Sequence, residues 1–489
     1  MKPSISAIDI ITFISYFTAI GLVAFFSTKK QKSDTDFLMG NRSLNFWLTA
    51  LSAHASDMSS WLFLAYPAMV FTHGLFEAWA AIGLTGFMFL NWHFIAPRIR
   101  YLTEQSNSLT LNSYFETRFG DTSGSIRIVS GSMSVLFFTV YISAGLVGLG
   151  LLTESLFNQS STDNTAIYHI GITAGLAIVV AYVFAGGYKT VAYIDLFQGF
   201  FLLGVIVFIP VYLLYQIGGI HPVMQAVAAK NLTTSLIPDF SPKTIWGILM
   251  TTLTWGLGYF GQPHIITKFM GIQKVSEIYK AKYLGISWQT IALSSATIIG
   301  LICIYYYPNG VNEPQLVSLD LVKDSLPLIS SLVLCAVLAA TTNVMAAQIL
   351  VVASNLSEDF YKKILRKHAQ PKELLLVSRL SVVLISLIAF AIAYFKIDSI
   401  YNLVLYAWSG LGASFGPLLL LSLHSKTINK FGAFAGILVG GSTAILTDYF
   451  FKDNSYGISS MIAGFTLSII AIPLVSFLTK KLNTPAVDL

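Results

Sequence analysis

The chain has 489 residues, of which 55% are hydrophobic and 11% are charged, and its formal net charge is +6. Soluble proteins carry about 25% charged residues, so this chain cannot cover its outside with polar groups and must face membrane lipid instead. The excess of positive charge therefore does not indicate a nucleic-acid partner.

Apolar segments of about 20 residues, long enough to cross a bilayer as a helix, recur along the whole chain. We predict an all-α integral membrane protein with about thirteen transmembrane helices, at residues 6–27, 46–72, 77–95, 125–156, 166–185, 193–217, 244–270, 283–307, 326–356, 374–395, 400–423, 433–451 and 459–478. The sequence holds no nucleotide-binding loop of the form G-x-x-x-x-G-K-[ST], so a gradient rather than ATP would drive any transport.

The basic residues divide unequally between the two sides of this arrangement. Of the 29 lysines and arginines, only six fall on one side: Lys2, Lys230, Lys243, Lys323, Lys396 and Lys452. Cytoplasmic loops are enriched in Lys and Arg. We therefore predict a multi-pass protein of a bacterial inner membrane, with the N-terminus outside and the C-terminus in the cytoplasm.

Two of the predicted helices contain residues that do not sustain a helix at mid-membrane. The second has a small and polar centre with the acid Asp57 embedded in it, and the seventh holds three glycines and a proline between Gly256 and Pro263. Gly and Pro disrupt helical hydrogen bonding, and unpaired backbone at membrane depth is tolerated only where it lines a cavity or a ligand. We therefore predict two broken helices, with a binding site where they meet.

Each broken helix opens a group of five helices, which predicts a 5+5 transporter core whose two repeats insert with opposite topology. The predicted parts are 1–45 (first helix and first cytoplasmic loop), 46–218 (first repeat), 219–243 (extracellular loop), 244–424 (second repeat) and 425–489 (helices twelve and thirteen).

Four polar residues near the breaks are candidates for coupling and gating. Asp57 is expensive at the centre of a bilayer unless it faces water, an ion or a partner, so it either supports a coupling-ion site or anchors the broken backbone. Asp195 is an inner ion-exit residue or a helix N-cap acid. Arg42 is a cytoplasmic charge or a gating residue, and His54 is a core histidine or a group that titrates during proton coupling.

Three aromatic residues, Tyr141, Trp255 and Tyr259, lie at membrane depth near the breaks, where packing is their commoner role. Trp255 and Tyr259 are one helical turn apart and flank the glycine-rich break, which favours a position facing the cavity. A small apolar ring such as that of proline could pack against them, while a half-helix dipole holds its carboxylate.

Several motifs resemble the sodium/solute symporter family, and most of all its bacterial sodium/proline symporter branch. They lie in order along nearly the whole chain: ALSAHASDMSSWL at 50–62, LTLNSYF at 109–115, FFTVY at 137–141, GLGYFGQPH at 256–264 and YAWSG at 406–410. The resemblance implies alternating access around the two breaks, with roles for Asp57 and Asp195 in sodium dependence and for Arg42 on the cytoplasmic face. It implies sodium binding at Ala55, Met58, Ala340 and the ninth-helix residue Asn343, and substrate binding at Ser59, Tyr141, Trp255, Tyr259 and Pro263.

The ninth helix departs from this branch of the family. Aligned on Leu338 and Gln348, the chain has Asn343 and Val344 where the branch has a Ser-Thr pair whose hydroxyls complete the sodium shell. Val344 has no oxygen, and Asn343 offers a carbonyl oxygen with a different reach. His54 also stands where the branch has a glycine. A proton as the coupling ion, an altered cation site and a cation-independent carrier all stay open.

The sequence thus predicts a secondary transporter, and not an enzyme, that imports a small amino acid by cation-coupled symport. L-proline is the first expectation for the substrate and sodium for the coupling ion, with no other cofactor. Three alternatives stay open: a proton-coupled or sodium-independent amino acid transporter, a symporter for another small carboxylate, and a membrane solute sensor.

Overall fold

The computed structural model describes residues 7–28, 33–157, 165–450 and 458–480. Within these ranges every regular element is a helix, and strand-like pairing is limited to two isolated bridges, Leu44–Ile272 and Gly74–Thr233. Ten of the described helices are long and apolar enough to cross a membrane. The predicted all-helical membrane class is therefore confirmed. The count of thirteen stays a prediction, because the two broken spans divide into shorter helices and one long helix joins two predicted spans.

Most predicted boundaries agree with the observed helices to within a few residues. The first part of the chain forms α1 (Ala7–Ser27), α2 (Asp34–Met39), η1 (Gly40–Arg42), α3 (Phe46–Ala55), η2 (Ser60–Leu62), α4 (Ala65–His73), η3 (Leu75–Glu77), α5 (Ala78–Leu90), η4 (Asn91–Ile95), α6 (Ala96–Gln105), α7 (Leu111–Arg118), α8 (Ser125–Phe157), α9 (Thr165–Ile217) and α10 (Ile220–Ala229). The second part forms α11 (Pro242–Gly256), η5 (Leu257–Gly261), α12 (Pro263–Met270), η6 (Val275–Glu277), α13 (Ile278–Tyr306), η7 (Pro314–Leu316), α14 (Val317–Ser325), α15 (Ser330–Ser354), η8 (Asn355–Leu365), α16 (Pro371–Tyr394), α17 (Ile400–His424), α18 (Lys430–Phe450) and α19 (Ser460–Leu478).

One difference concerns the fifth and sixth predicted helices, which form the single element α9 with a kink at Gly187 (φ 60°, ψ −160°). The sequence predicts a loop between them, but the residues on both sides of this glycine are helical. A residue without a Cβ adopts such a geometry readily, and a Cβ at Gly187 would lie 2.7 Å from the ring of Phe37 in α2. A single glycine therefore replaces the expected loop.

The first broken helix consists of α3, η2 and α4. Helical geometry ends after Ala55, and Ser59 adopts φ 46° and ψ −167°. The Oγ of Ser59 accepts a hydrogen bond from the backbone N–H of Trp61 (3.1 Å) and so caps η2. A positive φ at a non-glycine residue persists only where its surroundings hold it, which fits a break fixed by the fold rather than a frayed end.

The second broken helix consists of α11, η5 and α12. Gln262 is extended (φ −93°, ψ 99°), and Pro263 begins α12 at a position where its missing N–H has no helical partner to lose. A Cβ at Gly258 would lie 2.0 Å from the indole of Trp408, and one at Gly261 would lie 2.6 Å from the backbone of Gly416. These two glycines therefore let η5 approach α17 closely.

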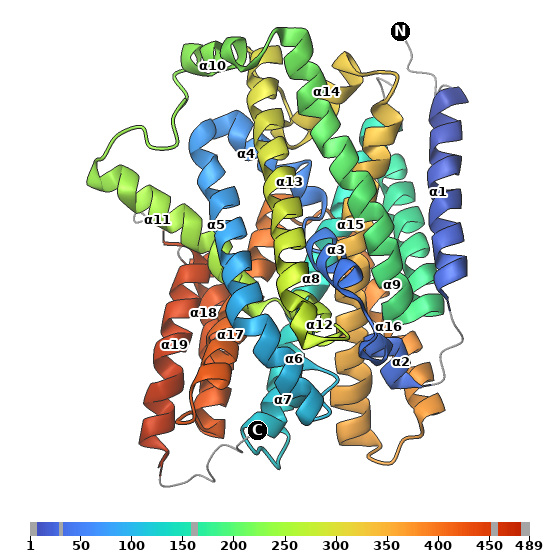
Figure 1. Ribbon diagram of the computed structural model, residues 1–489, viewed down its shortest axis with the longest axis vertical. Coiled ribbons are helices and arrows are strands. Elements are labelled where there is room, and N and C mark those ends of the chain that lie inside the picture. The colour runs from blue at the N-terminus through green and yellow to red at the C-terminus, as the bar shows by residue number, and fades with distance from the viewer. Residues whose placement is uncertain (1–6, 29–32, 158–164, 451–457, 481–489) are drawn as a thin grey trace.

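The breaks lie together inside the bundle (Figure 1). The first half of one broken helix, α3, packs against the second half of the other, α12. The long helix α15 packs against α3, η2 and α12, while α17 packs against η2, η5 and α8. In Figure 1 the N-terminus, α10 and α14 lie at the upper end of the bundle, and α2 and α7 lie at its lower end.

Candidate functional site

A small cavity of about 20 Å³, room for roughly one water molecule, lies between the two breaks. Its walls come from both broken helices and from α5, α8 and α17, with the residues Asp57, Met58, Trp61, Leu84, Tyr141, Trp255, Tyr259, Val404 and Trp408. Of the five predicted substrate residues, Tyr141, Trp255 and Tyr259 therefore line the cavity. Ser59 and Pro263 do not line it, and both shape the backbone of the breaks instead.

Asp57 is joined to the second broken helix by a hydrogen bond across the cavity. The hydroxyl of Tyr259 donates to Asp57 Oδ2, and the amide of Gln289 in α13 donates to the same hydroxyl (3.0 Å). The amide of Asn91 donates to the backbone carbonyl of Tyr259 (2.9 Å). These bonds hold the acid of one break and the aromatic ring of the other in fixed relation.

His54, a residue of α3, is fully buried. Its Nε2 accepts a hydrogen bond from the indole N–H of Trp92 (2.9 Å), and the two rings are stacked with their planes 9° apart. An imidazole nitrogen that accepts a hydrogen bond carries no proton. His54 is therefore a neutral packed histidine in this arrangement, and taking up a proton at Nε2 would break the bond to Trp92.

The predicted cation residues lie on α3, on the break that follows it and on α15. Ala55, Ala340 and Asn343 are fully buried, and Met58 is nearly so. Both side-chain amide atoms of Asn343 are buried without a hydrogen-bond partner in the described part of the chain. The hydroxyls of Thr341 and Thr342 instead bond to carbonyls of their own helix, at Val337 (2.8 Å) and Leu338 (2.8 Å).

This orphaned amide fits a cation ligand. Leaving a buried polar group without a partner lowers the free energy of unfolding by about 1–3 kcal/mol. Asn343 therefore destabilises the fold unless an ion or another group binds its oxygen. A carboxamide oxygen is a normal ligand for hard cations. The geometry is therefore compatible with a sodium site completed by Asn343, although the hydroxyl pair is missing.

Asp195 forms a buried ion pair with Lys268. Its Oδ2 lies 3.0 Å from the ammonium of Lys268, whose side chain is 2% exposed, and it accepts a hydrogen bond from Ser52 (2.5 Å). Asp195 belongs to α9, Lys268 to α12 and Ser52 to α3, so three elements meet at one carboxylate. Asp195 lies inside α9 and is therefore not an N-cap. Its Oδ1 is buried without a hydrogen-bond partner among the described residues, and a role in ion exit stays a prediction.

Arg42 closes the lower end of the bundle next to this ion pair. Its guanidinium donates to the backbone carbonyls of Thr103 (2.8 Å), Ser108 (2.9 Å) and Met270 (3.1 Å), and to the Thr103 hydroxyl (3.1 Å). Burial, and then the neighbouring Arg100, lower the pKa of Arg42 to about 10, so it is charged at neutral pH. It ties the end of α12 to α6 and to the loop that follows α6.

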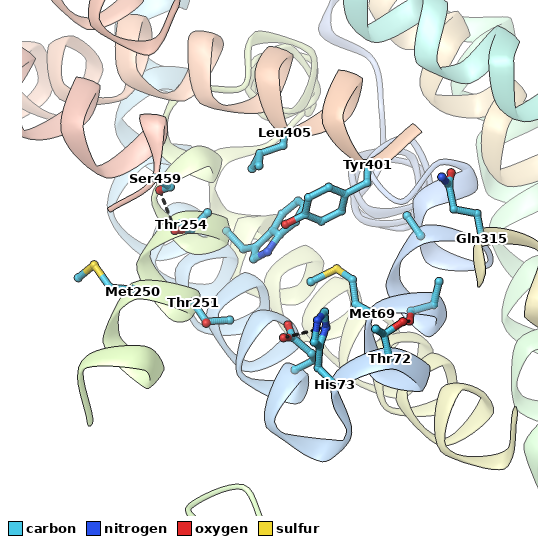
Figure 2. Close-up of a pocket in the computed structure, with 14 residues that line it drawn as sticks. Met69, Thr72, His73, Met250, Thr251, Thr254, Gln315, Tyr401, Leu405 and Ser459 are labelled. Carbon is cyan, nitrogen blue, oxygen red and sulfur yellow. Dashed lines mark hydrogen bonds and ion pairs between the residues drawn. The ribbon is translucent and has the colours of Figure 1, made fainter. Parts of the chain in front are cut away.

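A larger pocket of about 470 Å³ lies above the cavity. Figure 2 shows it, with Tyr401 and Leu405 on one wall, Met69, Thr72 and His73 on another, and Thr254 hydrogen-bonded to Ser459 (2.7 Å). Trp255 also lines this pocket. The ring of Trp255 packs against those of Trp61 (centroids 4.8 Å apart) and Tyr401 (6.0 Å). Trp255 lines both spaces, so an aromatic lid separates this vestibule from the inner cavity.

Sequence reasoning missed several residues of this site. Trp61 and Trp408 lie inside motifs that resemble a known family, which was the available signal for them. Lys268 was counted among the loop charges, because a lysine near a helix end is usually exposed. Ser52 also lies inside such a motif, at 50–62, whereas Gln289 carries no signal in a single sequence.

Comparison with known proteins yields a consistent group of transporters. A model of the "Sodium:solute symporter family" matches residues 37–440. The "High-affinity proline transporter PutP" of Bacillus subtilis is 36% identical over 96% of this chain and 97% of its own, and the "Sodium/proline symporter" of Escherichia coli is 35% identical over 98% and 94%. A solved structure of a Na⁺-coupled sialic acid symporter in a substrate-bound outward-open state superposes with a TM-score of 0.82 at 19% identity, over 99% of this chain and 100% of that one.

Proposed function

Because the chain belongs to the sodium:solute symporter family, a family of membrane transporters and not of enzymes, we propose that it couples the entry of sodium to the import of L-proline. The observation that supports this substrate is the inner cavity, which joins an acid from one broken helix to aromatic rings from the other. The curated relatives named as proline transporters cover nearly the whole chain.

The walls of the cavity suit a small apolar ring rather than a large polar solute, and the cavity, at about 20 Å³, would have to widen to admit the ring. Trp255, Tyr259 and Trp408 give it aromatic walls, and the rings of Tyr259 and Trp408 meet edge to face (centroids 5.1 Å apart). A pyrrolidine ring gains from such surfaces. Its carboxylate would be stabilised at a half-helix N-terminus next to the breaks, where unpaired N–H groups point outward.

We assign the sodium site to the carbonyls of Ala55 and Met58 together with Ala340 and the side-chain oxygen of Asn343. The buried and unpartnered amide of Asn343 supports this assignment. Asp57 belongs to the same break as Ala55 and Met58, and it accepts a hydrogen bond from Tyr259 in the wall of the cavity, so we expect filling of one site to order the other. Such shared ordering is a physical basis for coupling.

Alternating access would run through the two repeats, residues 46–218 and 244–424, as they rock about the site. We place the lower end of Figure 1 in the cytoplasm of a bacterial inner membrane, because α6 and α7, which carry Arg98, Arg100 and Arg118, lie there, whereas α10, which ends before Lys230, lies at the other end. On this assignment the vestibule faces outside, and the ion pair of Asp195 with Lys268 closes the inner side.

Proton coupling is the second candidate, with His54, Asp57 or Asp195 as the titrating group, and the contacts of His54 and Asp195 weigh against it. His54 already uses Nε2 to accept from Trp92, and Asp195 is compensated by Lys268. A carrier of another small carboxylate would need polar groups beyond those of this cavity. A solute sensor would use the same cavity without net transport.

The sodium assignment is tested by titrating the sodium dependence of proline uptake in two variants. Asn343→Ala removes the proposed ligand. We expect the apparent KM of this variant for sodium to rise about tenfold, because the loss of one interaction of ~1.4 kcal/mol weakens binding by that factor. Gln348→Ala is a matched control, because Gln348 is also a buried amide of α15 without a partner in the described ranges. Equal sodium dependence in the two variants would contradict the assignment.

A further inference from the structure

The outermost helix, α1, touches the rest of the bundle at few places and stands apart in Figure 1. Near its middle, Tyr16 accepts a hydrogen bond from Gln198 of α9 (2.7 Å) and packs against Phe201. At its lower end, Thr28 is hydrogen-bonded to Thr190 of α9 (3.3 Å). Between these two contact points Ile20 is buried and Val23 and Ala24 pack against the core, and a gap between α1 and α9 lies beside them.

A groove of about 420 Å³ opens in that gap, between Leu22, Val23, Phe26 and Ser27 of α1 and Lys189 and Tyr193 of α9. The α1 wall is apolar and faces lipid: Leu22 is 51% exposed and Phe26 is 78% exposed. We name these six residues the α1–α9 groove.

Lys189 is the charged residue among the six that line the groove. It follows the Gly187 kink at the lower end of α9, and its ammonium makes no ion pair among the described residues. Tyr193 lies four residues further along the same helix, so both side chains project from one helical face. The ammonium of Lys189 and the hydroxyl of Tyr193 therefore belong to the α9 wall of the groove, and its α1 wall is apolar and faces lipid.

We propose that the α1–α9 groove is a binding site for an anionic phospholipid, with the phosphate at Lys189 and Tyr193 and an acyl chain along Leu22, Val23 and Phe26. Basic pockets between membrane helices on the cytoplasmic side are suited to anionic headgroups. An acyl chain gains nothing from leaving one hydrocarbon surface for another, so selectivity must come from the headgroup and hence from Lys189. The inference takes from the proposed function only the leaflet that supplies the lipid.

The site adjoins the part of the molecule that is proposed to move. Tyr188, the residue before Lys189, donates its hydroxyl to the backbone carbonyl of Thr267 in α12 (3.0 Å). A lipid held at Lys189 would steady the kink from which this bond reaches the broken helix.

The test is native mass spectrometry of the purified full chain, titrated with phosphatidylglycerol or with phosphatidylcholine of the same acyl chains. We expect the wild-type protein to prefer phosphatidylglycerol about fivefold, which is the size of one basic contact to an anionic headgroup. Lys189→Gln should remove this preference. Lys372→Gln, which removes an exposed charge at the same end on α16, should leave it unchanged.

A second variant changes the width of the α1–α9 groove without changing its charge. Leu22→Trp narrows the groove and leaves Lys189 in place, so it should lower the occupancy of both lipids. Equal binding of the two lipids by the wild-type protein, an unchanged preference in Lys189→Gln, or a dimer whose formation displaces lipid would each overturn the proposal. Because lipid is counted directly, failure of the proposed transport activity would not be mistaken for failure of this site.

Discussion

At the upper end of the inner cavity three aromatic rings, those of Trp61, Trp255 and Tyr401, separate it from the vestibule. At the lower end the cavity is followed by charged side chains, the Asp195–Lys268 pair and the four hydrogen bonds of Arg42. Both ends are closed, but the upper closure is one layer of rings and the lower one joins α3, α6, α9 and α12.

The two closures differ in what it takes to open them. An aromatic pair contributes about 0.5–1.5 kcal/mol beyond its buried area, so a lid of such pairs can move with a change of side-chain position. Separating a buried ion pair leaves two charges without compensation and costs about 3–5 kcal/mol. On the proposed function, we expect substrate to enter by displacement of the aromatic rings, whereas release on the other side would require a larger rearrangement.

The largest expected effect follows from breaking the lower closure. Lys268→Met leaves Asp195 buried without its cation, at a cost of about 3–5 kcal/mol, and we expect a lowered Tm in detergent together with loss of uptake. Lys282→Met is the matched control, because Lys282 is also buried on a neighbouring helix but contacts the rings of Phe89 and Tyr283 rather than a carboxylate.

A double variant distinguishes the gate from a simple folding defect. Lys268→Met with Asp195→Asn removes both charges and should recover much of the Tm, while uptake stays low. Recovery of both, or normal uptake in the single variant, would show that the pair does not gate transport.

A smaller effect is expected inside the cavity, between the two closures. Tyr259→Phe removes the hydroxyl that joins Asp57 to Gln289 and should raise the apparent KM for sodium about tenfold, since a buried group left unpaired costs about 1–3 kcal/mol. Tyr66→Phe is the control, because its hydroxyl is equally buried and bonded to Thr297 (2.7 Å) outside the cavity. Similar sodium curves for the two variants would remove Tyr259 from the coupling path.

Arg42→Lys weakens the lower closure without removing its charge. An ammonium cannot reproduce the planar fork of a guanidinium, so initial uptake rates should fall about fivefold, the effect of losing one hydrogen bond of ~1 kcal/mol. Arg98→Lys, whose contact with the carbonyl of Leu423 is long (3.4 Å) and exposed, should be close to wild type. An Arg42→Lys rate equal to that of Arg98→Lys would mean that the four bonds are dispensable.

The smallest effect is expected at the upper lid. Tyr401→Ala removes one ring contact of Trp255 and should raise the KM for proline about threefold, in line with ~0.5–1 kcal/mol for an aromatic pair. Tyr305→Ala also removes a T-shaped ring pair, with Tyr306, but lies outside the vestibule. If Tyr305→Ala raised the KM as much as Tyr401→Ala, the lid would have no special role.

The features that sequence could predict are those determined by local chemistry. Gly258, Gly261 and Pro263 mark the second break because such residues disrupt a helix in any fold. Trp255 and Tyr259 followed from their spacing around that break. The loop expected before Tyr193 was wrong, because one glycine at positive φ can turn the chain without irregular residues on either side.

The rest depends on contacts between residues far apart in the chain. Lys268 and Asp195 are separated by 73 positions, and neither shows in the sequence that it neutralises the other. His54 had the chemistry of a proton acceptor, and only the position of Trp92 shows that its Nε2 is already in use. Ser59 and Pro263 were expected at the substrate and instead shape the broken backbone, which a motif alone does not distinguish.

The most direct test of the account is uptake of labelled proline into proteoliposomes under an inward sodium gradient, an inward proton gradient, or neither. The account predicts accumulation above equilibrium with the sodium gradient alone, because Asn343 is proposed to complete a cation site and both His54 and Asp195 are already engaged. Accumulation driven by the proton gradient alone would contradict it, as would the absence of proline movement under all three conditions.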